Sequence, residues 1–305
     1  MQLTHGRAVC TMVAVTLMWS IAGVVTRQLE SAHSFEVTFW RSFFTVVSLL
    51  VILPLWRGPG VFRAMPWKRG AFWLSGVSWS VMFTAFMLAL TLTTVANVLV
   101  TMAIGPLLTA LIARVFIGHR LPARTWAEIV VAGVGIAYMF GSQMNLDAMG
   151  QGSTMLGLLV ALCVPFAAAT NWTIVQRSQT HGDKIDLVPA VLLGAVISSM
   201  ATLPLAFPLV ATPRDVAWLA LLGLVQLAIP CVLAVMCAKV LKAPEVSLLA
   251  LLEVIFGILW AWLWGNETPG QEVLLGGVLV IGALLANELL GMRRSQAPTH
   301  NRRTT

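Results

Sequence analysis

Long apolar runs separated by short polar loops form a regular pattern along this chain of 305 residues. An α-helix needs about 20 apolar residues to cross the hydrocarbon core of a bilayer. The pattern therefore predicts an all-α membrane protein with ten transmembrane helices. The expected spans are residues 8–28, 34–56, 69–91, 94–116, 123–141, 154–176, 187–209, 215–239, 244–264 and 271–291.

The ninth run contains a single acidic side chain near its middle. Pro244 stands in the first turn of the expected helix, where its missing N–H costs nothing, and Glu253 lies about halfway along. A carboxylate at mid-depth costs at least about 2.5 kcal/mol unless it finds a partner, water or a proton. Glu253 is therefore either a substrate, ion or proton site, or a structural acid that is neutral or hydrogen-bonded between helices.

The same stretch has a counterpart earlier in the chain. Thr94–Phe140 aligns with Leu241–Asn287 at a shift of 147, and Val46–Leu55 aligns with Val196–Leu205 at a shift of 150. Both matches indicate two copies of one unit. The identities at the first shift pair Ala96 with Ala243, Ala103 with Ala250, Gly118 with Gly265, Pro122 with Pro269, Val131 with Val278 and Gly135 with Gly282.

Each copy holds five expected helices, an odd number, so the second copy must enter the membrane from the opposite side. The chain is thus predicted to be two inverted five-helix repeats, residues 1–150 and 151–291, with a disordered cytoplasmic tail at 292–305. Many secondary transporters have this architecture and bind their substrate near the midplane, between the repeats.

The composition supports a membrane protein. Hydrophobic residues make up 58% and charged residues 10% of the chain, whereas soluble domains carry about 25% charge. A net charge of +7 could suit nucleic acid. The basic residues lie in loops, however, so we expect a lipid bilayer around the protein and no nucleic-acid partner. Because 15 of the 19 Lys and Arg residues fall on one side, both termini are expected in the cytoplasm of a multi-pass bacterial inner-membrane protein.

Catalytic and metal-binding motifs are missing from the sequence. The four cysteines lie inside apolar runs without zinc or disulfide spacing, so we expect no metal and no cofactor. There is no HExxH, GxSxG or P-loop sequence, which argues against an enzyme and against an ATP-driven pump.

Several stretches together resemble a known family. They are Leu17–Arg27, with Trp19 in the first helix; Phe39–Phe44, with Arg41 early in the second; and the paired units Ala96–Gly135 and Ala243–Gly282. With Glu253-Val254 in the ninth helix, this pattern is similar to the drug/metabolite transporter superfamily, in its ten-helix EamA-type branch. Gly118-His119-Arg120 departs from the family pattern.

The resemblance implies export of small solutes, typically amino acids, by alternating access through a central cavity. Helices one, three, four, six, eight and nine usually line that cavity. Aromatic amino acid exporters of the YddG type are the subgroup we expect first. The four-helix multidrug branch depends on a carboxylate in helix one, and none occurs between Ala8 and Thr26.

Polar residues and prolines in these helices are the candidate site. Their structural alternative is hydrogen bonding or packing between helices, for which small and hydroxylated residues are common. The expected substrate-binding residues are Glu253, Gln226, Asn97, Trp79, Ser78, Thr101, Trp19, Ser20 and Asn171, with hinges at Pro106, Pro165 and Pro230.

Arg41 lies about two turns inside the second expected helix. We expect it to snorkel back to the outer interface, near Glu36, in a structural role.

The sequence therefore predicts a secondary transporter that exports small metabolites, with amino acids as the first candidates. A multidrug or organic-cation exporter is one alternative. A sugar-phosphate transporter is another, but it would need buried Lys or Arg, and only Arg41 lies deep. A non-transporting membrane scaffold is the alternative from another class. The sequence does not decide between monomer and homodimer.

Overall fold

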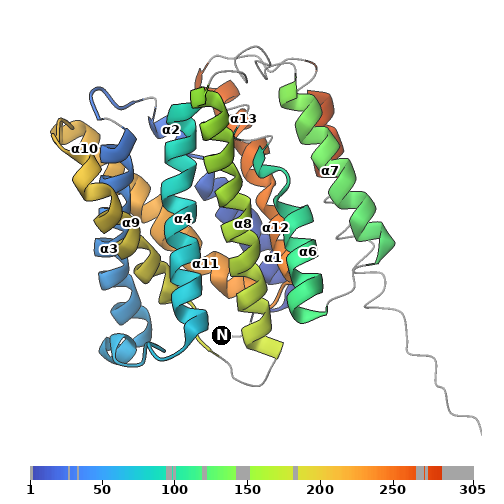
Figure 1. The fold of residues 1–305 in the computed structure, drawn as a ribbon, viewed down its shortest axis with the longest axis horizontal. Coiled ribbons are helices and arrows are strands. Elements are labelled where there is room, and N and C mark those ends of the chain that lie inside the picture. The colour runs from blue at the N-terminus through green and yellow to red at the C-terminus, as the bar shows by residue number, and fades with distance from the viewer. Residues whose placement is uncertain are drawn as a thin grey trace, which may run out of the picture.

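The computed structural model describes residues 3–26, 28–32, 34–93, 98, 101–118, 122–141, 152–180, 185–265, 271 and 274–283. All regular structure in this described part is helical (Figure 1). The elements of the first half are α1 (His5–Trp19), α2 (Ala22–Thr26), α3 (Ser34–Arg57), η1 (Pro59–Phe62), α4 (Gly70–Leu92), α6 (Gly105–Ile117) and α7 (Ala123–Gly141). Those of the second half are α8 (Gly152–Thr180), α9 (Ala190–Ala206), α10 (Pro213–Leu221), η3 (Leu222–Ala228), α11 (Ile229–Ala238), α12 (Ala243–Ala250) and α13 (Leu252–Gly265), and residues 274–283 are also helical.

The lengths and composition of these helices suit a membrane. Six helical stretches in the described part are long and apolar enough to span it, and four shorter apolar helices accompany them. Large apolar side chains cover the outside, such as Leu55 at 82% and Val115 at 77% exposure. Every one of these stretches falls on a run predicted from the sequence.

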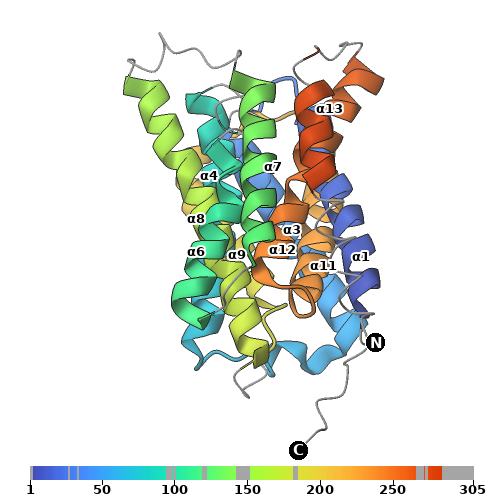
Figure 2. The same cartoon turned by 90° about the vertical axis from the view of Figure 1, so that its right-hand side faces the viewer.

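The bundle is held together by close helix crossings. α4 packs against α8 and α9, α3 against α9 and η3, α1 against α11, and α12 against α6. Glycines permit two of these approaches: a Cβ on Gly194 would lie 2.4 Å from the Cβ of Trp79, and one on Gly223 would lie 2.9 Å from the Arg41 carbonyl oxygen. Figure 2 shows α6 and α8 on one side and α1, α11 and α13 on the other.

Four of the expected spans are interrupted. The first bends at Ser20 and Ile21, between α1 and α2; the fourth turns at Ala103 and Ile104, just before α6; the eighth widens into the π-helical segment η3; and the ninth divides at Leu251. The span expected over 244–264 is present as one stretch of spanning length, Ala243–Trp264, with this turn inside it. At the break the Leu251 amide donates to the Leu248 carbonyl at 3.1 Å, a tighter turn than the α-helix.

Acidic side chains join α3 and α9 at both ends. Glu36, in the first turn of α3, accepts from the amides of Val210 at 3.1 Å and Ala211 at 2.9 Å, just after α9. Asp186, just before α9, pairs with Arg57 at the end of α3 and with Lys239 at 2.9 Å. The two helices are therefore antiparallel, and each is tied to the other at both of its ends.

Candidate functional site

Arg41 is buried inside the bundle and does not reach the outer interface. Its side chain is 2% exposed, and Nη2 donates to the Phe83 carbonyl of α4 at 2.9 Å. Nε has no hydrogen-bond partner within the described protein. The expected snorkelling is wrong because α4 and η3 cover Arg41, and Glu36 is occupied by the loop after α9. A buried guanidinium is costly unless a negative group compensates it.

Glu253 is the acidic group that the sequence places in the ninth span. It lies in the first turn of α13, directly after the break at Leu251, and is partly buried. No hydrogen bond or ion pair joins Glu253 to Arg41 within the described residues. The N-terminus of a helix also favours negative charge. Arg41 and Glu253 therefore do not form a structural ion pair with each other.

The first helix brings further groups to this interior. Trp260 donates from Nε1 to the Ser20 hydroxyl at 2.9 Å, and it stands two turns after Glu253, on the same face of α13. The Trp19 carbonyl accepts a long 3.5 Å hydrogen bond from Gln226. The end of α1 thus lies against both η3 and α13.

Several buried polar atoms in this interior have no partner within the described protein. Besides Arg41 Nε, they include Trp79 Nε1, Asn171 Nδ2 and Gln226 Oε1. An unsatisfied buried polar group costs about 1–3 kcal/mol, so a native structure provides it with water or a ligand. Unpaired donors and acceptors from α3, α4, α8 and η3 are what a polar solute would bind.

The α4–α8 side of the bundle is ordered by aromatic and amide contacts. Trp79 meets Trp172 edge-on at 5.6 Å between ring centroids, and Ser75 donates to Asn171 Oδ1 at 2.6 Å. These contacts hold the Asn171 amide in place and leave its nitrogen free.

The other predicted residues lie in different places. Ser78 donates to the Leu74 carbonyl of its own helix, and Ser20 donates to the Leu17 carbonyl. Asn97 lies outside the described residues. Among the expected hinges, Pro106 stands in the first turn of α6, directly after the turn at Ile104, Pro230 follows η3 as the second residue of α11, and Pro165 lies inside the continuous α8.

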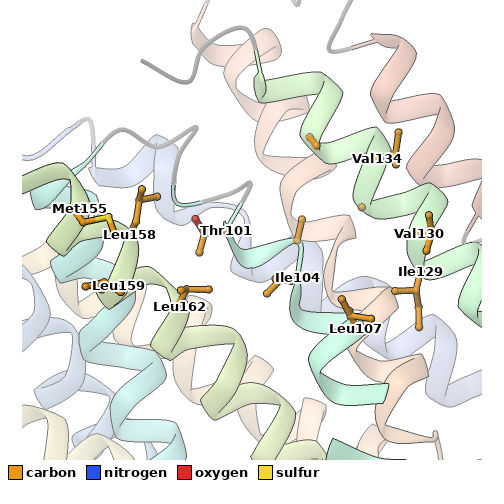
Figure 3. A pocket seen from close by; sticks show the side chains of 13 residues that line it. Thr101, Ile104, Leu107, Ile129, Val130, Val134, Met155, Leu158, Leu159 and Leu162 are labelled. Atoms are coloured by element: carbon orange, nitrogen blue, oxygen red, sulfur yellow. The ribbon is translucent and has the colours of Figure 1, made fainter. Parts of the chain in front are cut away.

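Thr101 lines a different space, a pocket of about 640 Å³ between α6, α7 and α8 (Figure 3). Its other lining residues are apolar, among them Ile104, Leu107, Ile129 and Met155. None of the charged or unpaired groups around Arg41 lines this pocket. Such a surface can accept hydrocarbon, but it offers little to orient a polar solute.

Sequence reasoning missed Arg41 as a site residue. The available signal was the same one that singled out Glu253, an ionisable side chain deep in an apolar run. It also missed the hydroxyl chain in which Ser198 meets Ser42 at 3.0 Å and Thr84 at 2.9 Å.

The fold and the site define the class of protein. It is a helical, multi-pass membrane protein with ionisable side chains in its interior. The EamA-like transporter family matches residues 6–141 and 155–287, and the chain belongs to this family of membrane transporters.

Relatives and a solved structure agree with this assignment. A pseudopaline exporter of Pseudomonas aeruginosa (strain UCBPP-PA14) is 25% identical over 261 residues, covering 82% of this chain and 84% of the exporter. An S-adenosylmethionine uptake transporter of Rickettsia prowazekii (strain Madrid E) is 23% identical over 288 residues, covering 92% of each chain. A crystal structure shares the fold with a TM-score of 0.78 at 17% identity, covering 95% of this chain and 100% of the other.

Proposed function

We propose that this protein is a secondary transporter that exports small metabolites, amino acids first, by alternating access through the interior around Arg41 and Glu253. One observation carries the proposal. Arg41 is buried and keeps Nε unpaired within the described protein, in an interior where Trp79 Nε1 and Gln226 Oε1 also lack partners. Polar groups with a structural role are paired when they are buried, whereas a binding site leaves such groups for a solute.

The broken helices support alternating access. Discontinuous helices at the midplane are a common feature of transporter sites, since their ends supply charge and their breaks permit bending. The turn at Ile104 and the break at Leu251 lie 147 residues apart, which is the shift that aligns the two halves of the sequence.

The packing also supports two inverted five-helix repeats, residues 1–150 and 151–291. The crossing of α4 with α8 has its counterpart in α11 with α1, and that of α6 with α8 in α13 with α1. Glu36 and Asp186 are 150 residues apart and tie opposite ends of α3 to α9. Both features suit a pseudo-two-fold axis in the membrane plane. Both termini then lie in the cytoplasm.

Counterflow in proteoliposomes tests this function. Vesicles carrying the purified protein would be loaded with unlabelled solute and offered labelled L-amino acids, organic cations and sugar phosphates in turn. We expect accumulation of amino acids, with apolar or aromatic ones competing. No accumulation of any class by a folded protein would contradict a transporter and favour the scaffold alternative.

The direction of transport needs its own measurement, because one relative is an exporter and the other an uptake transporter. We expect loss of the gene to raise the internal concentration of the transported solute in cells fed with it as a dipeptide. A lowered internal concentration would indicate uptake.

An organic-cation exporter is the second candidate, and Glu253 is the observation that favours it. An acid beside aromatic side chains could bind a cation. Arg41 argues against an organic-cation exporter, because a buried positive charge repels a cationic solute.

A further inference from the structure

We infer that the apolar pocket between α6, α7 and α8 is a binding site for one acyl chain of a membrane phospholipid. This is the pocket of about 640 Å³ that Thr101 lines. The site is separate from the interior around Arg41, and it does not depend on which solute the protein transports.

The lining of the pocket suits hydrocarbon. Thr101 carries the one polar side chain among the described lining residues, and all the others are apolar. A bound water needs several polar partners, and a polar solute needs groups that fix its orientation. The described lining offers neither, whereas a hydrocarbon chain needs only close apolar contact.

The rim of the pocket lies at the outer surface of the bundle. Val130 and Val134 of α7 and Met155 and Leu159 of α8 line it, and each is more than half exposed. In a membrane transporter, exposed apolar side chains of spanning helices face the hydrocarbon of the bilayer. The pocket therefore opens to the bilayer between α7 and α8 (Figure 3).

The packing of α7 explains why protein does not fill this space. α7 packs on the helical stretch 274–283, where a Cβ on Gly135 would lie 2.9 Å from the Gly276 carbonyl oxygen. α6 packs against α8, but α7 makes no comparable contact with α8 within the described residues. At Gly133, which lines the pocket, an added Cβ would meet nothing within 4 Å. An apolar wall without neighbouring atoms loses dispersion contacts, which an entering chain would restore.

The depth and length of the pocket match one acyl chain. Ile104 and Leu107 of α6 lie near the middle of the fourth expected span, and Met155 lies near the start of the sixth. From Met155 to Leu162 the pocket follows α8 for about 10 Å, at about 1.5 Å per residue. One leaflet contributes about 15 Å of hydrocarbon, so a chain that runs from the interface to the midplane fits this length.

Photolabelling with a lipid probe tests the site. The purified protein in detergent micelles would be titrated with a phosphatidylglycerol that carries a diazirine in one acyl chain, and the cross-linked peptides would be identified by mass spectrometry. We expect labelling of α7 and α8 at the pocket to saturate, because a site holds a limited number of chains. Labelling of the exposed face of α3 at Val47 and Val51 should rise in proportion to the probe.

Gly133→Leu should fill part of the pocket and lower its labelling at least about threefold, because the leucine side chain takes space that the acyl chain needs. Gly282→Leu is the matched control. Gly282 also has nothing within 4 Å of an added Cβ, but it does not line the pocket, so labelling should stay at the wild-type level. If Gly133→Leu fails to fold, the titration of the wild type still decides.

Several results would overturn the acyl-chain site. They are labelling at the pocket that rises in proportion to the probe as on α3, and unchanged labelling of folded Gly133→Leu. Displacement of the probe by L-phenylalanine would assign the pocket to the transported solute. Absence of labelling at the pocket of a dimeric protein would assign it to a second copy of the chain. Each of these results leaves counterflow unaffected, so failure of this inference is distinct from failure of the proposed function.

Discussion

At the scale of the residue, the fate of an ionisable side chain in a membrane helix depends on what covers it. Arg41 and Glu253 both interrupt apolar runs, and both carry the same cost in hydrocarbon. Arg41 cannot extend to the interface, because neighbouring helices bury it to 2% exposure. Its partner is a backbone carbonyl, and this leaves the charge itself available to a solute.

Glu253→Gln should reduce transport at least about tenfold while keeping expression and Tm close to those of the wild type. The amide has the same shape as the acid, but it carries no negative charge to attract an ammonium group and cannot take up a proton. Glu30→Gln is the control, since Glu30 lies in an exposed ion pair with Arg214. Normal transport by Glu253→Gln would mean that this acid has a structural role only.

Lys239 makes the stability depend on pH at the other end of the bundle. Burial and the nearby Arg57 lower the pKa of Lys239 from 10.5 to about 8, despite its ion pair with Asp186. The unfolded chain therefore binds more protons between these two values, so the free energy of unfolding should rise as the pH increases from 8 towards 10.5.

Thermal unfolding in detergent, measured between pH 7.5 and 10, checks this dependence. Lys239→Met should remove the increase, and Lys68→Met, at an exposed position, should retain it. A Lys239→Met protein whose Tm still rises like that of the wild type would assign the effect to another group.

At the scale of the element, glycines and helix breaks set the shape of the site. Gly223 lets η3 approach α3 at Arg41, and the widened turn of η3 directs Gln226 inward. A π-helical turn inside an α-helix is often found at functional sites, where it repositions the side chains around it. The break at Leu251 has a similar effect on Glu253, because it begins a new helix one residue before the acid.

Gly223→Ala should lower the stability by about 1–3 kcal/mol. The added Cβ would lie 2.6 Å from the Phe44 Cβ and 2.9 Å from the Arg41 carbonyl oxygen, so the two helices must separate. Gly133→Ala is the matched control in α7, where nothing lies within 4 Å, and it should be neutral or slightly stabilising. Equal Tm values for the two variants would contradict the close packing of η3 on α3.

At the scale of the whole molecule, the sequence predicts the pattern of membrane spans but not the side-chain contacts inside the bundle. Length and hydropathy predict the helical runs, because a segment that crosses the bilayer must be apolar, long enough and internally hydrogen-bonded. These requirements do not depend on which helices pack beside it. The break at Leu251 could not be predicted from the sequence, since no glycine or proline lies near the turn. The burial of Arg41 and the partners of Gln226 and Asn171 depend on residues more than 40 positions away, and no local pattern reports them.

The inverted arrangement of the halves predicts which loops face which side. Leu209 follows α9, near Glu36, and Arg63 follows α3, near the opposite end of the bundle. With Cys10→Ala and Cys163→Ala as the background, Leu209→Cys should react with a membrane-impermeant maleimide in intact cells. Arg63→Cys should react only after permeabilisation. Reaction of both from outside would contradict the orientation.

Solute counterflow by matched proteoliposomes tests most directly whether the interior around Arg41 is a transport site. Vesicles would carry the wild type, Arg41→Gln or Arg214→Gln at equal protein content and accumulate labelled L-phenylalanine or L-methionine. We expect equal accumulation by the wild type and Arg214→Gln, and at most about a tenth of it by Arg41→Gln. Full accumulation by Arg41→Gln, or none by the wild type for any solute class, would show that transport does not depend on this interior.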